Sequence, residues 1–167
     1  MLTERLELRP LPLAAAAALP GDRDGAADLI GAKLPDDWPQ PDVLGVLPRH
    51  AKLEEGSMHF GVWVIIERAS GMVVGDIGFH GPPSDERTVE IGYAIVPSRR
   101  RRGYATEAAG AIAGWALRQP EIDTVVAGCD PENVSSIRTL ERAGFERTDE
   151  ADGQLRWRRA RDALNRT

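Results

Sequence analysis

Three residues, Arg100, Gly103 and Ala105, are spaced so that they could bind an anion at the start of a helix. An alternating apolar run precedes them and an alanine-rich run follows them, which predicts a strand, a turn and a helix. Gly103 can adopt a positive φ, and small residues let a ligand approach the backbone closely. The first N–H groups of a helix have no partner within it, so this junction favours the phosphates of a nucleotide-like cofactor.

Four consecutive arginines, residues 99–102, stand in this predicted turn. Such a run can also bind nucleic acid or act as a targeting signal. The formal net charge of the chain is −5, so we favour the phosphates of a cofactor over nucleic acid. The turn fits neither a Walker loop nor a Rossmann fingerprint, and on this pattern alone a plain turn that packs a helix on a strand is an equal alternative.

A second motif lies downstream, where Asn133-x-x-Ser136 opens a predicted helix that ends at Gly144-Phe145. Together, the two motifs resemble the GNAT acetyltransferase superfamily. Residues 3–10 and 90–93 further resemble the branch that includes the ribosomal-protein alanine N-acetyltransferases. The resemblance extends over the chain except for residues 12–58.

The resemblance implies a mixed α/β (α+β) single-domain fold: a bent, mostly antiparallel sheet, flanked by helices, in which two parallel strands splay apart around acetyl-CoA. Those strands would be residues 89–96 and 123–129. The backbone of Ile95 and Val96 would bind the pantetheine arm, and Asn133 and Ser136 would touch its other side. The remaining implied cofactor contacts are Arg100, Arg101, Arg102, Gly103, Tyr104, Ala105 and Thr106, whose amides from residue 101 onward would hold the pyrophosphate.

Two positions depart from the family pattern. Arg101 replaces a glycine found in many members, and we expect the backbone contacts to survive if its φ is negative. Leu140 replaces a tyrosine that protonates the departing thiolate in many members. Ser136 or water could serve instead, or the thiol, with a pKa of about 8.5, could leave as the thiolate without an acid.

Glu90 matches the position of the family's base or water-orienting residue; the alternative is a solvated carboxylate on the polar face of its strand. His80, at the end of a predicted strand, is a candidate substrate contact or else a solvated turn residue. Trp38 stands in the proline-rich segment 35–41, where it would contact substrate if exposed and otherwise fill the core.

The three histidines, at positions 50, 59 and 80, have no metal-binding spacing among themselves or with Cys129, so we expect no metal. Cys129 is expected to pack as a small apolar residue. A lone cysteine permits no internal disulfide, which suits the cytoplasm.

The patterns of apolar residues predict the following elements, among which the strands 60–67, 72–79 and 88–96 form an antiparallel meander. The strands are 2–11, 60–67, 72–79, 88–96, 123–129, 145–148 and 155–159, and the helices are 14–18, 26–32, 43–55, 106–118 and 133–143. Asp42 would cap the helix 43–55, and Gly56 would end it. The strand 123–129 would be buried on both faces, and residues 160–167 would fray.

The composition bounds the classes of protein that fit. The 167 residues, 42% hydrophobic and 28% charged, are typical of a single globular domain spanning 1–167. The sequence contains no apolar run long enough to cross a membrane, and its first five residues lack a signal peptide's basic head and apolar core. We therefore expect a cytoplasmic protein without membrane or nucleic-acid partners; its oligomeric state, a homodimer included, stays open.

The sequence thus predicts an N-acetyltransferase that passes acetyl from acetyl-CoA directly to a primary amine, either a protein N-terminus or a small amine. Glu90 and Ser136 are the candidate catalytic residues. Two alternatives stay open: a non-catalytic acyl-CoA-binding sensor of the same fold, and a nucleic-acid-binding module.

Overall fold

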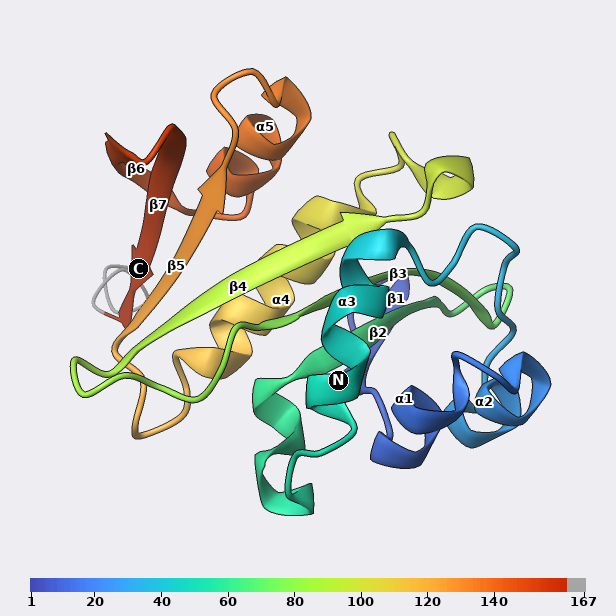
Figure 1. Cartoon of the computed structure of the whole chain (residues 1–167). Coiled ribbons are helices and arrows are strands. Elements are labelled where there is room, and N and C mark those ends of the chain that lie inside the picture. The colour runs from blue at the N-terminus through green and yellow to red at the C-terminus, as the bar shows by residue number, and fades with distance from the viewer. Residues whose placement is uncertain (162–167) are drawn as a thin grey trace.

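A seven-stranded sheet with the order β1-β2-β3-β4-β5-β7-β6 organises the computed structural model, which describes residues 1–161 (Figure 1). The strands are β1 (Leu6–Pro10), β2 (Val62–Glu67), β3 (Met72–Phe79), β4 (Thr88–Ile95), β5 (Thr124–Cys129), β6 (Glu146–Ala151) and β7 (Gln154–Ala160). The α-helices are α1 (Leu13–Ala18), α2 (Arg23–Ile30), α3 (Pro41–His50), α4 (Tyr104–Ala116) and α5 (Val134–Arg142). Two 3-10 helices, η1 (Glu55–Phe60) and η2 (Pro97–Arg99), complete the described elements.

Helices cover both faces of this sheet, so the central strands are buried on both sides. On one face, α4 packs against alternate strand residues such as Leu8 and Ile65. On the other face, α1, α2 and α3 pack against the intervening residues, such as Val64 and Val73. This period of two follows from strand geometry, in which successive side chains point to opposite faces.

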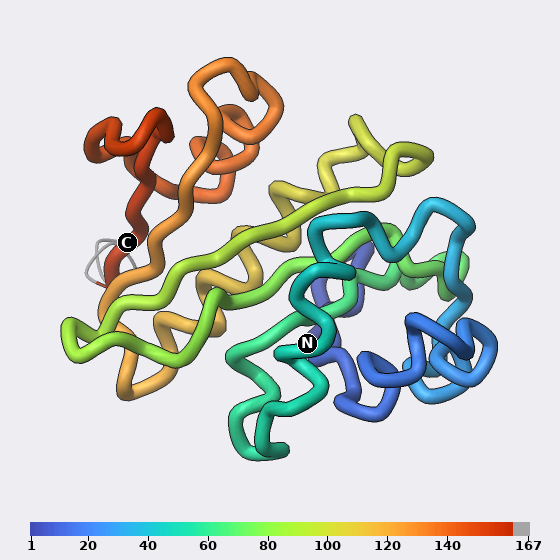
Figure 2. The backbone as a smooth tube through the Cα atoms, in the orientation of Figure 1, coloured from blue at the N-terminus to red at the C-terminus, as the bar shows by residue number. Residues whose placement is uncertain are grey.

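The parallel pair of strands opens into a cleft part-way along its length, as predicted. β4 and β5 pair only from Thr88 with Thr124 to Ile91 with Ala127. Beyond that point β4 stays paired with β3, while β5 stays paired with β7. The two strands therefore diverge, and the ends of β4 and β5 stand apart in the trace (Figure 2).

The third helix begins and ends earlier than its apolar pattern predicts. Pro41 occupies its first turn, where a missing N–H costs nothing, and the extended residue Gln40 precedes it, so Asp42 is not the cap. The helix ends at His50, and Gly56 lies inside the separate 3-10 helix η1 rather than ending α3. The expected range 43–55 is therefore wrong at both ends, and the expected cap at Asp42 is wrong because Gln40 holds that position.

β5 also differs from the prediction, because its burial alternates along the strand instead of continuing on both faces. Val125, Ala127 and Cys129 face the core under α4 and are buried. The opposite face stays partly exposed, since α1, α2 and α3 cover the other end of the sheet (Figure 1).

Ala160 is the last residue of β7. Residues 162–167, which make up most of the segment 160–167 that we expected to fray, lie outside the described residues. In residues 1–161, no helix has the length and apolarity needed to cross a bilayer.

Candidate active site

The loop before α4 forms an open helix N-terminus. Gly103 has a φ of 79° and directly precedes the helix, which starts at Tyr104 rather than at the predicted residue 106. The backbone N–H of Glu107 donates to the carbonyl of Gly103 at 3.1 Å, which closes the first helical turn. The N–H groups before it belong to the open end of the helix, where they can bind an anion.

This N-terminus faces a cavity of about 820 Å³ that lies between the end of β4 and helix α5. The cavity brings together the two sequence motifs, although about 30 residues separate them. Its walls include Ile95, Arg100, Arg101, Arg102, Gly103, Tyr104, Ala105, Thr106, Asn133 and Ser136, which are all the predicted cofactor residues except Val96. Arg99, Arg138 and Arg142 also line it, so its electrostatic character suits a polyanion.

Val96 differs from the other expected cofactor residues in the direction of its backbone groups. Its N–H donates to the carbonyl of Val74 at 3.0 Å, and its carbonyl accepts the N–H of Arg99 at 2.9 Å. Backbone groups alternate in direction along a strand, so Val96 faces β3, whereas Tyr93 and Ile95 face the cleft. Both backbone groups of Val96 therefore have partners within the protein, which argues against its expected contact with a pantetheine arm, whereas the backbone groups of Tyr93 face the cleft.

Arg101 also departs from the expected conformation. Its φ is 62°, in the left-handed region that glycine tolerates best. The condition on which we expected the replacement of glycine to be harmless, a negative φ, is therefore not met. A non-glycine residue in this region carries a cost of about 1 kcal/mol or more, which the surrounding contacts must offset.

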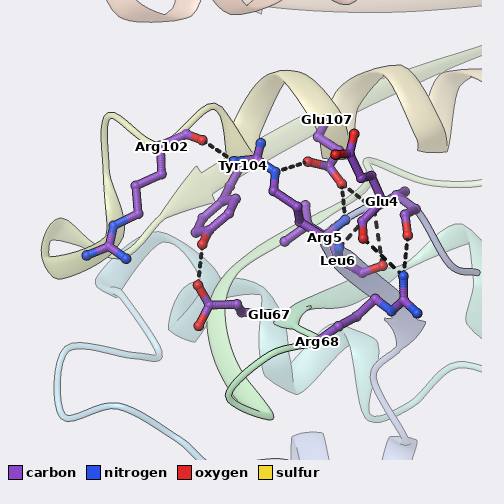
Figure 3. A network of polar contacts seen from close by, with 9 residues as sticks. Glu4, Arg5, Leu6, Glu67, Arg68, Arg102, Tyr104 and Glu107 are labelled. Carbon is purple, nitrogen blue, oxygen red and sulfur yellow. Dashed lines mark hydrogen bonds and ion pairs between the residues drawn. The ribbon is translucent and has the colours of Figure 1, made fainter.

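A polar network fixes the N-terminus of α4 to the segment before β1 and to the end of β2 (Figure 3). The Arg5 Nε atom donates to Glu107 at 2.8 Å, and its Nη1 atom donates to the carbonyl of Arg102 at 2.6 Å. The hydroxyl of Tyr104 donates to Glu67, which the Arg99 guanidinium also approaches at 3.5 Å. The loop before α4 is thus held by Arg5 and by the carboxylates of Glu67 and Glu107 as well as by its own sequence.

Glu107 is the central acceptor of this network. Its Oε1 atom accepts the Thr3 hydroxyl at 2.6 Å and the backbone N–H of Arg5 at 2.8 Å, in addition to the Arg5 side chain. Burial acts to raise the pKa of Glu107, but these hydrogen bonds outweigh it and hold the pKa below its usual value. The ionised carboxylate therefore stabilises the fold near neutral pH.

We expect Glu107→Gln to lower the free energy of unfolding by about 1–2 kcal/mol at pH 7, because an amide satisfies fewer of the three donors. The carboxylate's contribution is present above its unfolded pKa, about 4.5, and is lost as pH falls through its lower folded value. Urea unfolding at pH 7 and pH 4 measures this. An equal difference between the two proteins at both pH values would contradict the assignment, and Glu146→Gln on exposed β6 is the control.

A second cavity, of about 470 Å³, lies on the face of the sheet that α3 covers. It is mainly apolar, with Val43, Phe60, Ile77 and Phe79 among its lining residues. Asp76 and His50 are its buried polar groups, and His80 is an exposed one. Tyr93 and Ala94 line this cavity and the arginine-rich cavity alike. The two cavities therefore meet at these two residues of β4, just beyond the point where β4 and β5 separate.

Glu90 and His80 lie together at the outer part of this site. His80 lines the second cavity, and its Nδ1 atom is 3.6 Å from Glu90, whose side chain is 38% exposed. Arg156 approaches the same carboxylate at 3.8 Å. Gly92 makes room for the imidazole, since a Cβ there would lie 2.8 Å from His80 Nε2. Glu90 lines neither cavity, and His80 is the lining residue of the second cavity that its carboxylate approaches.

Trp38 is only 1% exposed, so it belongs to the core and does not line the second cavity; the exposed alternative is wrong. Its Nε1 atom donates to Oδ2 of Asp76 at 2.9 Å. Burial raises the pKa of Asp76 to about 6, against the opposing effect of this hydrogen bond. Sequence reasoning missed Asp76, whose signal was a lone carboxylate inside the apolar strand 72–79.

Tyr93 and Ser136 face each other across the cleft and share a hydrogen bond of 2.8 Å between their hydroxyl groups. Burial raises the pKa of Tyr93 to about 12, so its hydroxyl stays protonated at neutral pH. Asn133 caps α5 by accepting the N–H of Ser136 at 3.0 Å. Leu140, at the position of the family tyrosine, is fully buried.

Comparison with known proteins decides which family this arrangement belongs to. The model of the acetyltransferase (GNAT) domain family matches residues 5–146. The chain belongs to the GNAT family. It is an N-acetyltransferase, and it is 31% identical over 146 residues to the uncharacterized N-acetyltransferase YjdG of Bacillus subtilis, covering 86% of this chain and 87% of that one.

Solved GNAT structures share this fold. An acetyltransferase from Agrobacterium tumefaciens superposes with a TM-score of 0.64 at 28% identity, covering 95% of this chain and 92% of that one. The ribosomal L7/L12 α-N-protein acetyltransferase RimL, in complex with coenzyme A, superposes with a TM-score of 0.67 at 18% identity, covering 98% of each chain. The predicted family and the bent sheet with its parallel splayed pair are thus confirmed.

Proposed function

We propose that this GNAT enzyme transfers acetyl directly from acetyl-CoA to a primary amine in the cytoplasm. The observation that carries the proposal is the junction at Tyr93 and Ala94, where an arginine-rich cavity meets an apolar cavity that contains carboxylate and imidazole groups. A polyanionic co-substrate fits the first cavity, and an amine fits the second. Their reacting ends would then meet on β4.

The residues of the first cavity suit coenzyme A in three regions. The open amides of Arg101 to Thr106, with the surrounding arginines, would hold the phosphates. The backbone of Tyr93 and Ile95 faces the cleft and would bind the pantetheine arm, with Asn133 and Ser136 on its other side. Bound acetyl-CoA supplies an activated acetyl thioester.

The residues at the junction would assist transfer as follows. A backbone N–H near Ile95 would donate to the developing oxyanion of the acetyl group. Glu90 would take up the proton that the attacking amine releases, through His80 or water. Ser136, hydrogen-bonded to Tyr93, would donate to the departing sulfur, in place of the tyrosine that Leu140 replaces.

An acetyl-CoA turnover assay against small amines and N-terminal peptides tests the proposal. We expect release of CoA that depends on the amine, with one acetyl group appearing on the amine nitrogen by mass spectrometry. Tight binding of acetyl-CoA without turnover across the whole panel would contradict transfer and favour a non-catalytic sensor.

Direct transfer also predicts that Cys129 is dispensable. Cys129 is buried, and its sulfur accepts the indole N–H of Trp157 at 3.3 Å, which is a core contact. Cys129→Ala should therefore retain most of the turnover. A pre-steady-state burst of CoA, together with an acetyl adduct on Cys129, would replace direct transfer with a covalent mechanism.

A further inference from the structure

Asp76 is a buried carboxylate with one fixed partner. It is 9% exposed, lines the apolar cavity and accepts the Trp38 indole N–H at 2.9 Å. Across residues 1–161, no other hydrogen bond reaches this carboxylate, and no cationic side chain lies within 4.0 Å of it. Carboxylates this buried are rare unless they are paired, so a ligand cation would complete the site.

The charged groups that surround Asp76 do not supply that cation. Asp42 on α3 acts on Asp76 as a like charge. His50 is held neutral, because its Nε2 atom faces the Leu11 carbonyl at 2.8 Å, its Nδ1 atom accepts the Val62 N–H at 3.0 Å, and burial lowers its pKa.

The remaining charged groups that line the cavity stand further out. Arg49 lies on the exposed side of α3, and His80 follows the end of β3. On β4, the facing residues are Gly92 and Ala94, which carry no charge.

Asp76 also lies at the place where a reacting nitrogen is needed. It pairs with Ala94 across β3 and β4, and Ala94 lines both cavities. Hydrogen-bonded partners on antiparallel strands have Cα atoms about 5.5 Å apart. Glu90 lies four residues from Ala94 on the same strand, or about 14 Å at 3.4 Å per residue. Of the two carboxylates, Asp76 is the one placed to hold a nitrogen at the junction.

We propose that Asp76 binds the ammonium group of the acceptor, and that the acceptor is a monoamine with an apolar body. This inference rests on the proposed acetyl transfer and names the substrate class of its second cavity. Asp76 fixes the nitrogen beside Ala94, and Glu90 takes up the released proton through His80 or water.

The walls of the cavity set the apolar part of this substrate class. On the α3 side of the sheet, toward which Asp76 points, the apolar lining residues are Val43, Val46, Leu53 and Val62. An apolar body gains about 25 cal/mol for each Å² that it buries against such walls. A polycation would place most of its other ammonium groups against these walls, which is unfavourable, because Asp42, exposed on α3, is the one further carboxylate among the lining residues.

Calorimetric binding of 2-phenylethylamine and of its neutral isostere, 2-phenylethanol, tests this assignment at pH 8 in the presence of CoA. The wild type should prefer the amine. Asp76→Asn keeps an acceptor for Trp38 but removes the charge, and it should weaken amine binding at least thirtyfold while leaving the alcohol unchanged. Asp28→Asn, an exposed carboxylate on α2, removes the same charge elsewhere and should keep the preference.

Turnover gives the second readout. With Asp76→Asn, kcat/KM for 2-phenylethylamine should fall at least thirtyfold, mainly through KM. In the wild type, spermidine should be a far poorer acceptor than 2-phenylethylamine. Retained preference for the amine over the alcohol in Asp76→Asn, or equal use of spermidine, would overturn the inference. Calorimetry answers the Asp76 question even if no amine is turned over, an outcome that would contradict acetyl transfer instead.

A pH measurement separates loss of binding from loss of folding. The pKa of Asp76 is raised to about 6 from 3.8, so the folded state holds more protons than the unfolded state between these values. Wild-type stability contributed by this group therefore falls as pH rises from about 4 to 6. Asp76→Asn lacks this loss and should melt at a higher temperature than the wild type at pH 8, which excludes unfolding as the cause of weak binding.

Discussion

Gly103→Val should abolish calorimetric binding of acetyl-CoA while the protein stays folded. Gly103 has a φ of 79°, and a β-branched residue is a genuine outlier in this region. A Cβ at position 103 would also lie 3.3 Å from Nη2 of Arg5, the side chain that holds the carbonyl of Arg102. To relieve both problems the loop must rotate, which turns the open amides of α4 away from the phosphates.

Arg101→Gly is the matched control for this variant, because it changes the neighbouring left-handed position in the favourable direction. The φ of Arg101 is 62°, which glycine adopts without strain, so the loop conformation should persist. Binding should then weaken only by the loss of one exposed cation, about tenfold at most. Wild-type affinity in Gly103→Val, with unchanged circular dichroism, would remove the phosphate-loop assignment.

These two positions also show how far the sequence could predict the cofactor cavity. The motif from Arg100 to Ala105 was enough to predict a strand, a turn and an open helix, because each depends on local patterns. It was not enough to predict the φ of Arg101, which stands between Arg99, in contact with Glu67, and Arg102, in contact with Arg5. These partners are distant in sequence.

The direction of the backbone groups at Ile95 and Val96 could not be predicted for a different reason. Strand 88–96 was predicted nearly to its ends. Whether the backbone groups of Ile95 or of Val96 face the cleft depends, however, on which residue forms backbone hydrogen bonds with β3. That parity is set between strands and shifts by one residue with any change of register. A single sequence does not determine it.

The apolar cavity was the least predictable part, because residues far apart in the chain build it. Trp38, from a proline-rich segment without regular periodicity, packs beneath Asp76 of β3. In the sequence, Trp38 alone is consistent with an ordinary core residue, and Asp76 alone with an isolated carboxylate in an apolar strand. Only the fold places them in contact and puts the carboxylate opposite Ala94, where the two cavities meet.

Glu90→Gln should lower kcat by 10²–10⁴ at pH 7 for an aliphatic amine, which is the typical range for general-base catalysis. Such an amine, with a pKa near 10.4, costs about 4 kcal/mol to deprotonate at pH 7.4. The Glu90 carboxylate lies 3.6 Å from His80, which lines the apolar cavity, so the pair offers a route for the proton. Arg156, at 3.8 Å, helps to hold the carboxylate on this side.

The pair gives a sharper test than either residue alone. If the proton passes from the amine through His80 to Glu90, His80→Gln and Glu90→Gln should not be additive, and the double variant should resemble the worse single one. Additive losses would mean that the two residues act separately. Asp149→Asn, on the exposed strand β6, controls for the loss of one negative charge.

The dependence on pH links Glu90 to the identity of the acceptor. The loss in Glu90→Gln should shrink as pH rises, because free amine accumulates and needs no base. For an α-amino group with a pKa near 7.8, deprotonation costs well under about 1 kcal/mol at pH 7.4, so the effect should be smaller and the profile flatter. The measurement is kcat/KM against pH, with 2-phenylethylamine and phenylalaninamide as the two substrates. If wild type and variant superimpose on both, Glu90 is a solvated strand residue, and the proton leaves the amine by another route, for which Asp76 is the nearest carboxylate in the cavity.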